Sequence, residues 1–151
     1  MNREIESDAA MRAFGEKLGG ALTSGVAIEL VGDVGAGKTT FVKGLARGLE
    51  VSDDVQSPTF TISRIYKARD GLELRHYDFY RLNEPGVMQM ELAESIADPA
   101  AITVVEWGDI VADILPRDHV TLRFSSPSET SRHVTLAAGG ENSQKLIEVL
   151  Q

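Results

Sequence analysis

The 151-residue sequence contains no cysteine. Disulfides, thiolate metal sites and cysteine nucleophiles are therefore excluded. Basic residues are in the minority, because 15 lysines and arginines stand against 23 aspartates and glutamates, which gives a formal net charge of −8 at pH 7. Such an acidic chain is poorly suited to binding nucleic acid through a basic surface of its own, although it can act on nucleic acid through a more basic partner.

Long hydrophobic runs are absent as well. Residues 1–6 are polar and no apolar stretch follows them, so we expect no signal peptide, no membrane span and a cytoplasmic location. Hydrophobic residues make up 42% of the chain and charged residues 25%, which is typical of globular proteins and excludes fibrous and disordered classes. We expect a single domain over residues 1–151, large enough to bury a substantial core.

The most specific motif occupies residues 32–39, where G-D-V-G-A-G-K-T fits the P-loop pattern G-x-x-x-x-G-K-[ST]. Glycines let backbone N–H groups face a phosphate, and the start of the following helix adds unpaired donors. We expect Lys38 to reach the β- and γ-phosphates and the Thr39 hydroxyl to ligate Mg²⁺. The motif indicates a nucleoside triphosphate site; the alternative is a glycine turn before a helix.

The hydrophobic periodicity predicts the order of the elements. Helices are expected over residues 8–22, 39–49, 87–96, 108–115 and 141–150, and strands over residues 26–31, 60–66, 72–79, 101–105, 119–124 and 132–136. Ser7 is expected to cap the first helix, and a turn at residues 70–71 to close a hairpin. Strands that alternate with helices around an inserted hairpin predict a three-layer α/β, P-loop NTPase-like domain with a mixed, partly parallel sheet.

Two carboxylates are candidates to work with the P-loop, which needs an acid near Mg²⁺ and a group that positions the attacking water. Glu106 follows the apolar run 102–105, so it stands in the Walker-B position at the end of a buried strand. The alternative is a glutamate at the edge of the core with a basic partner. Asp78 shares a strand face with His76. A structural His–Asp pair is the competing interpretation, and His76 is expected to orient or support, not to catalyse.

Three further positions give weaker signals. Residues 57–59 read Ser-Pro-Thr where GTPases place a segment that senses the γ-phosphate, so Thr59 is a switch-like candidate, although such a tripeptide also marks ordinary turns. Trp107, the only tryptophan, either packs in the core or forms a contact surface. Arg132 is a candidate contact or a plain solvent-exposed arginine.

Missing motifs narrow the class of P-loop protein. There is no N-K-x-D for guanine recognition and no D-x-x-G after an apolar strand, which disfavours a GTPase. The S-G-G-Q motif of ABC proteins is absent too. An arginine-rich lid, expected of a small-molecule kinase of this size, is not evident in the sequence.

Four motifs occur in a fixed order. They are G-D-V-G-A-G-K-T-T (32–40), S-P-T-F (57–60), H-Y-D-F-Y-R (76–81) and V-E-W-G-D (105–109). In this combination the chain resembles the bacterial tRNA threonylcarbamoyladenosine biosynthesis ATPase family, TsaE, from the N-terminal helix to the C-terminal strands. The match departs over residues 85–96, which fit only loosely the acidic, leucine-bearing pattern expected after H-x-D-x-Y-R.

The resemblance implies an activity and its partners. The family binds ATP with Mg²⁺, hydrolyses it slowly to ADP, and associates with a transferase subunit and that subunit's scaffolding paralogue. Together they make the N6-threonylcarbamoyl modification of adenosine 37 in tRNAs that read codons starting with A. ATP turnover is implied to depend on the partner subunits and to reset the complex between cycles, with tRNA met only indirectly and no membrane involved.

The resemblance also implies roles for individual residues, carried over by position. Catalysis would depend on Lys38, Asp78 and Glu106, and Mg²⁺ would be bound by Thr39 and Glu106. Thr59 would lie in the switch-like segment, with Trp107 beside the site. The positions that contact the nucleotide would be Ser7, Asp8, Asp33, Val34, Gly35, Ala36, Gly37, Lys38, Thr39, Thr40 and Arg132, with Ser7 or Asp8 and Arg132 at the nucleoside end.

The leading hypothesis is therefore an ATPase subunit within a tRNA-modifying assembly. Two alternatives stay open. One is a nucleotide-dependent binding module, in which ATP occupancy sets the affinity for partners and hydrolysis is incidental. The other is a small-molecule kinase, which the P-loop and the chain length would also suit.

Overall fold

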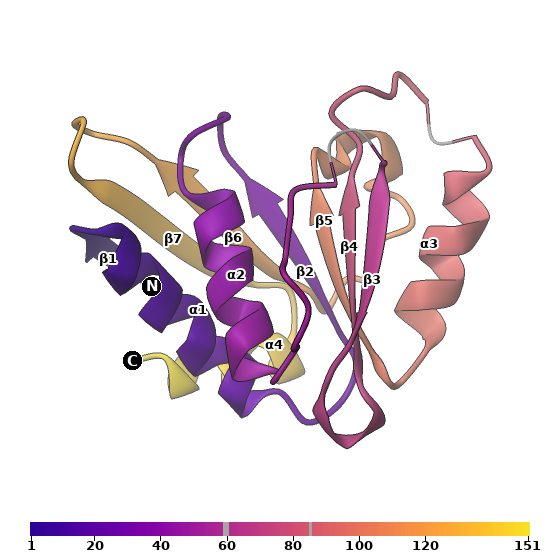
Figure 1. Cartoon of the computed structure of the whole chain (residues 1–151). Coiled ribbons are helices and arrows are strands. Elements are labelled where there is room, and N and C mark those ends of the chain that lie inside the picture. Colours follow the sequence, from indigo (N-terminus) through magenta and orange to yellow (C-terminus); the bar gives the residue numbers. More distant parts are fainter. Residues whose placement is uncertain (59–60, 85) are drawn as a thin grey trace.

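The computed structural model describes residues 1–58, 61–84 and 86–151. Within these residues the strands form one seven-stranded sheet in the order β1-β7-β6-β2-β5-β4-β3 (Figure 1). The strands are β1 (Asn2–Ile5), β2 (Val26–Val31), β3 (Ser63–Lys67), β4 (Glu73–Asp78), β5 (Ala101–Glu106), β6 (Val120–Ser125) and β7 (Arg132–Ala138). The helices are α1 (Asp8–Ala21), α2 (Lys38–Gly48), α3 (Met88–Ala97) and α4 (Glu141–Val149), with short 3₁₀ segments η1 (Arg69–Gly71) and η2 (Gly108–Val111).

The centre of the sheet is parallel and its margins are antiparallel. Strands β6, β2, β5 and β4 pair in parallel, whereas β3 pairs antiparallel with β4, and β7 pairs antiparallel with both β6 and β1. The carboxyl ends of β2, β4 and β5 consequently meet at one edge of the sheet, and the P-loop follows β2 at that edge. Ligands bind at such an edge in open α/β sheets.

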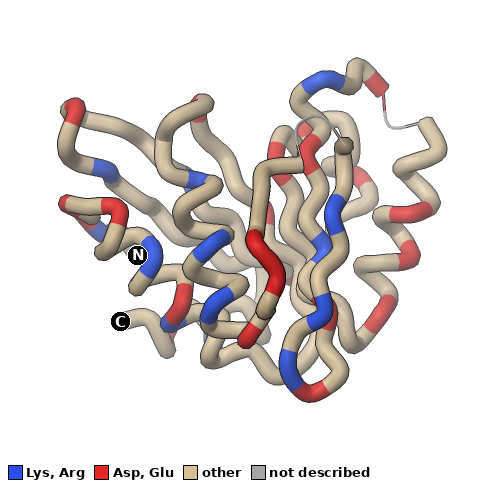
Figure 2. The backbone as a smooth tube through the Cα atoms, in the orientation of Figure 1, with Lys and Arg blue, Asp and Glu red and all other residues tan. Residues whose placement is uncertain are grey.

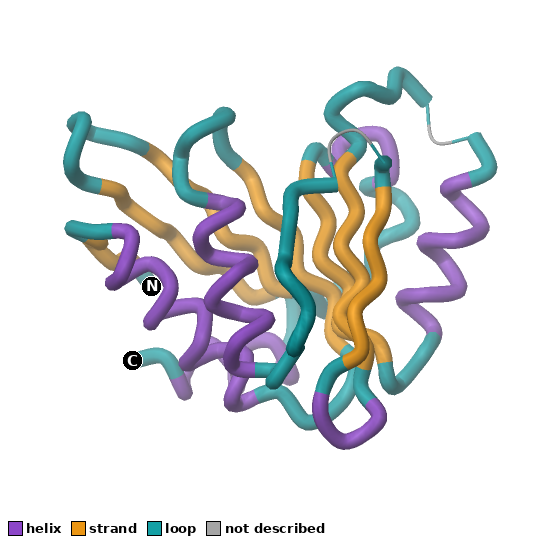
Figure 3. The backbone as a smooth tube through the Cα atoms, in the orientation of Figure 1, coloured by secondary structure: helices purple, strands orange, loops and turns teal. Residues whose placement is uncertain are grey.

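Helices lie on both faces of the sheet, with α1 and α2 on one face and α3 on the other (Figure 3). Alternate residues of β5 show the division. Ile102 and Val104 belong to the core that includes α1, α2 and α4, whereas Val105 packs on the opposite face with Leu92 of α3. The predicted three-layer α/β architecture with a mixed sheet is confirmed.

Helices α1 and α2 touch through their backbones. Gly15 and Gly19 of α1 lie against α2, and Gly44 and Gly48 of α2 lie against α1. A Cβ at Gly15 would overlap the carbonyl oxygen of a residue in α2, and one at Gly44 would overlap that of Arg12. The G-x-x-x-G spacing in each helix thus lets the two approach with no side chain between them, which fixes α1 directly against the helix that leaves the P-loop.

Most element boundaries agree with the sequence prediction. Ser7 caps α1, where its hydroxyl accepts a hydrogen bond from the Ala10 amide at 3.0 Å. The strand predicted over residues 60–66 begins only at Ser63, because the amides of Thr61 and Ile62 both donate to the Pro58 carbonyl in a turn. Phe60, predicted to start that strand, lies outside the described residues.

Two segments differ from the prediction. The helix expected over residues 108–115 is reduced to η2, since Ala112 and Ile114 donate to carbonyls three residues back and the segment is rich in residues of low helix propensity. Strand β1 was not predicted. Only Ile5 is buried in it, so the apolar alternation that marks a strand is missing from this edge.

Helix α3 reflects the excess of acidic residues in the chain. Figure 2 shows acidic residues recurring along α3, and this helix carries no lysine or arginine. Among the described residues, no helix has both the length and the apolar composition that a bilayer span requires. The side chains of α3 are thus acidic or uncharged.

Arg69, in η1, hydrogen-bonds to backbone carbonyls at the carboxyl end of α1. Its Nη2 donates to the carbonyl oxygens of Gly19, Gly20 and Leu22 at 2.8, 3.2 and 2.8 Å, while the side chain is only 17% exposed. A helix end leaves several carbonyls without partners, and a cation there also complements the helix dipole. The guanidinium thus ties the β3–β4 hairpin to the end of α1.

Replacing Arg69 by Met should lower the free energy of unfolding by about 1.5–3 kcal/mol, because the carbonyls lose a charged donor. Urea denaturation measures the loss. Arg47→Met is the matched control, because the Arg47 side chain is 72% exposed and makes a solvent-exposed ion pair with Glu16 at 3.8 Å. This substitution should change the free energy of unfolding by no more than about 0.5 kcal/mol. Equal losses in the two variants would contradict the role assigned to Arg69.

Candidate nucleotide-binding site

The P-loop has the backbone conformation that its glycines predict. Gly32, Gly35 and Gly37 have φ angles of 151°, 86° and 107°, a region that other residues rarely adopt. A Cβ at Gly37 would in addition lie 2.8 Å from Met11 Cε. Gly37 is the N-cap of α2 and supplies no side-chain cap, so the first amides of α2 are left for an anion.

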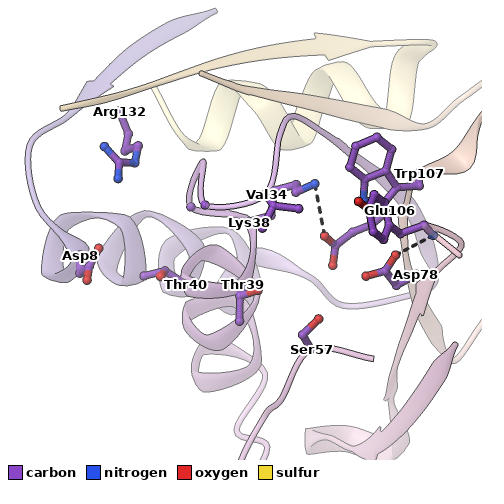
Figure 4. A pocket seen from close by; sticks show the side chains of 13 residues that line it. Asp8, Val34, Lys38, Thr39, Thr40, Ser57, Asp78, Glu106, Trp107 and Arg132 are labelled. Carbon is purple, nitrogen blue, oxygen red and sulfur yellow. Dashed lines mark hydrogen bonds and ion pairs between the residues drawn. The ribbon is translucent and has the colours of Figure 1, made fainter. Parts of the chain in front are cut away.

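A cavity of about 440 Å³ opens over this loop, a size usual for small-molecule sites (Figure 4). The residues that line it are Asp8, Val34, Gly35, Gly37, Lys38, Thr39, Thr40, Ser57, Asp78, Tyr80, Glu106, Trp107 and Arg132. Figure 4 shows Asp8 and Arg132 at one end and Asp78, Glu106 and Trp107 at the other, with the P-loop between them. The cavity thus has one end that holds Asp78 and Glu106 and another that is lined by Asp8 of α1 and Arg132 of β7.

The two candidate carboxylates lie side by side. Strands β4 and β5 are parallel, and their register sets Asp78 opposite Glu106 at the carboxyl ends. Each residue is 4% exposed. Glu106 Oε1 lies 3.7 Å from Lys38 Nζ, and Asp78 Oδ1 accepts a hydrogen bond from the Tyr80 amide at 2.9 Å. Two strand ends therefore bring both acids to the lysine end of the cavity.

Lys38 is held from three sides. Its Nζ donates to the Gly32 carbonyl at 2.5 Å, faces Glu106, and lies 4.7 Å from the centroid of the Trp107 ring. A cation over an indole face is attracted by the ring quadrupole. The Trp107 ring also packs 4.9 Å from the ring of Tyr80. Trp107 therefore contributes both to packing and to the wall of the cavity.

His76 of β4 is fully buried and contacts the neighbouring strand β5. Its Nε2 lies 2.5 Å from Glu106 Oε2. The sequence placed His76 on the same strand face as Asp78, with a structural His–Asp pair as the competing interpretation of Asp78. The hydrogen bond of His76 Nε2 goes to the glutamate of the neighbouring strand. Period-2 alternation gives the face of one strand but not the register of the next, which is why this contact was missed.

Several predicted residues fall outside the cavity lining. The Ser7 hydroxyl is used to cap α1. Within the P-loop, Ala36 is buried and its amide bonds to the Asp33 carbonyl at 3.1 Å, so these two residues shape the loop. Thr59 lies outside the residues that the structure describes.

Two lining residues were not predicted as site residues. They are Ser57 and Tyr80. Both belong to the motifs S-P-T-F and H-Y-D-F-Y-R, and that membership was the only sequence signal for them.

The side chains suit Mg²⁺ bound together with a nucleotide. In the part of the chain that the structure describes, no group of three or more histidine or acidic residues could hold a metal ion by itself. Mg²⁺ commonly takes one or two carboxylates, several waters and substrate phosphates. The Thr39 hydroxyl and the Glu106 carboxylate line the same cavity, which fits that pattern.

Known proteins are similar to this chain in sequence and in fold. The family model of the threonylcarbamoyl adenosine biosynthesis protein TsaE matches residues 5–134. The tRNA threonylcarbamoyladenosine biosynthesis protein TsaE of Streptomyces coelicolor is 40% identical over 139 residues, covering 87% of this chain and 92% of its own length. The protein of the same name from Bacillus subtilis is 35% identical over 148 residues, covering 97% and 87%.

A solved structure agrees with the sequence comparisons. The crystal structure of Bacillus subtilis YdiB matches with a TM-score of 0.84 and 29% identity, covering 99% of this chain and 93% of its own. The resemblance predicted from the four motifs is confirmed. The chain belongs to the TsaE family.

Proposed function

We propose that this protein is a Mg²⁺-dependent ATPase subunit of the assembly that makes N6-threonylcarbamoyladenosine at position 37 of tRNA. Family membership and the names of the relatives support the pathway. The observation that carries the ATPase proposal is the buried contact between Lys38 of the P-loop and Glu106 at the end of β5, inside a cavity of nucleotide size. A phosphate-binding cation and a Walker-B acid are the parts that phosphoryl transfer to water requires.

Each part of the cavity has a task in this proposal. Lys38, Thr40 and the loop amides bind the phosphates of ATP and ADP, while Asp8 and Arg132 meet the nucleoside. Thr39 and Glu106 would hold Mg²⁺, which supplies positive charge beside the phosphates when it is bound. Asp78 orients the attacking water, whose oxygen bonds to the γ-phosphorus as the bond from that phosphorus to the β–γ bridging oxygen breaks. ADP and inorganic phosphate leave, and the water proton passes to the phosphate or to solvent.

The proposal includes the two partners that the family resemblance implies, the transferase subunit and its scaffolding paralogue. An acidic protein of this kind would meet tRNA only through those partners. ATP turnover would reset the complex between modification cycles. A cytoplasmic location and a single domain over residues 1–151 belong to the same proposal.

A second candidate function is a nucleotide-dependent binding module with incidental hydrolysis. It is favoured by apolar side chains on the cavity lining that face solvent, since Val34 is 77% exposed and Tyr80 is 52% exposed. Exposed apolar groups at the mouth of a site suit a partner that covers it. In that case ATP occupancy alone would set the affinity for the partner.

The assignment of Lys38 is tested by ATP affinity. Lys38→Ala should weaken ATP binding at least tenfold, because a charge-assisted phosphate contact contributes about 1.5–3 kcal/mol. Isothermal titration calorimetry measures the change, and the turnover of ATP with both partners should fall in parallel. Lys43→Ala, at an exposed position of the same helix, is the control and should bind ATP as the unmodified protein does. Unchanged affinity in Lys38→Ala would refute the site.

A further inference from the structure

His76 is a buried polar side chain to which the proposed mechanism gives no task. Its imidazole, 0% exposed, lies on the same face of β4 as the core residue Leu74 and the site residue Asp78. Nε2 is 2.5 Å from Glu106 Oε2, while Glu106 Oε1 faces Lys38 Nζ at 3.7 Å. The carboxylate of Glu106 therefore lies between a histidine, which contacts one of its oxygens, and a lysine, which contacts the other.

The surroundings of the ring indicate which nitrogen carries the proton. Nδ1 of His76 is buried and has no hydrogen-bond partner among the described residues. A buried N–H without an acceptor is strongly disfavoured, and a neutral imidazole has one donor and one acceptor nitrogen. The proton therefore belongs on Nε2, from which it is donated to Glu106 Oε2.

Of the two side chains that contact the Glu106 carboxylate, His76 is the one expected to keep its contact when ATP binds. Lys38 has other contacts, to the Gly32 carbonyl and the Trp107 ring, and in the proposed function it turns to the phosphates of ATP. His76 has no such alternative, because its ring is enclosed and β4 is paired on both sides, by β3 and β5. When the lysine engages phosphate, the hydrogen bond from His76 is the contact that still orients the glutamate.

We infer that His76 is a positioning residue that holds the Glu106 carboxylate toward the cavity while Lys38 binds phosphate. This inference rests on the proposed function. It assigns His76 no contact with ATP, with Mg²⁺ or with the reacting atoms. Loss of the residue should therefore affect turnover and the use of Mg²⁺ much more than the binding of nucleotide.

Three substitutions test the hydrogen bond. His76→Gln keeps an N–H donor at the level of Nε2, His76→Asn moves the donor to the level of Nδ1, and His76→Leu removes it. In full-length protein with both partners, His76→Leu and His76→Asn should lower kcat for ATP about 10- to 100-fold, with KM changed less than about threefold. His76→Gln should restore kcat to within about fivefold of the unmodified protein. Equal rates in the Gln and Asn variants would overturn the inference, and thermal unfolding identifies any variant that fails to fold.

A binding readout separates this inference from the proposed function. Calorimetry gives the gain in ADP affinity on addition of Mg²⁺, and His76→Leu should reduce that gain while leaving metal-free ADP affinity unchanged. In a Glu106→Gln background the same substitution should have no further effect, because His76 acts only through Glu106. A persisting effect in that background would overturn the role of His76. An unmodified protein that hydrolyses no ATP with both partners present would instead refute the proposed function.

Discussion

Replacing Glu106 by Gln is expected to lower ATP turnover at least about 100-fold while ATP still binds. The amide keeps the size of the side chain and can accept the hydrogen bond from His76, but it removes the charge that would serve Mg²⁺ or the attacking water. Lys38 and the loop amides, which would bind the phosphates, remain in place. Phosphate release measured with both partner subunits gives the rate, and calorimetry gives the affinity.

Glu29→Gln is the matched control for this substitution. Glu29 lies on the neighbouring strand β2, one residue before the position paired with Glu106, and so on the opposite face of the sheet, where it accepts a hydrogen bond from Thr121. Its replacement should leave turnover within about twofold. A Glu106→Gln protein that hydrolyses ATP at the normal rate would rule out Glu106 as the working carboxylate.

The same variant separates the two candidate functions. If ATP turnover resets the tRNA-modifying assembly, Glu106→Gln should permit one round of modification per complex and abolish further rounds. If the chain is a binding module, bound ATP is sufficient and repeated rounds should continue. Counting modified tRNA per complex therefore decides between the ATPase and the module.

The second large effect concerns the crossing of α1 and α2. Gly44→Ala should lower the free energy of unfolding by about 3 kcal/mol, the upper part of the range for overpacked sites. The added methyl would meet the backbone of Arg12 and not a side chain that could rotate away. Urea denaturation measures the loss, and the midpoint of thermal unfolding should fall with it.

Gly20→Ala, in the partner helix, is expected to change the free energy of unfolding in the opposite direction. Gly20 lies in α1. Apart from its chain neighbours and the backbone of its own helix, no atom of the described residues would lie within 4 Å of a Cβ there. Alanine is the better helix former, so this variant should gain about 0.5–1 kcal/mol. Similar changes in both variants would show that helix propensity, and not the close approach of the backbones, governs these positions.

Local patterns were sufficient to predict much of this fold. The strand before the P-loop, the cap at Ser7 and the alternation of helices and strands follow from periodicity and short motifs. The sequence could not reveal β1, whose residues pair with β7 at a separation of more than 120 positions. Nor did it reveal the α1–α2 crossing, because a glycine four residues from another glycine in a soluble helix usually signals only a weaker helix.

The site was predictable to the extent that its residues belong to motifs. Lys38, Asp78, Glu106 and Trp107 do line one cavity, as their order in the chain suggested. The bond between His76 and Glu106 depends on which strands are neighbours in the sheet, and no single segment contains that information. Register between distant strands is a tertiary property.

The close contact of their backbones predicts that helices α1 and α2 move as one rigid body. Packed helices normally slide past each other by small changes in side-chain rotamers at their interface, and here the backbones themselves are in contact. Asp8 and the P-loop are therefore carried on a common platform. Ser57, Tyr80 and Trp107 come from segments outside it. If the cavity changes shape between the ATP-bound and ADP-bound forms, we therefore expect the segments that carry Ser57, Tyr80 and Trp107 to move, while Asp8 and the P-loop keep their relative positions.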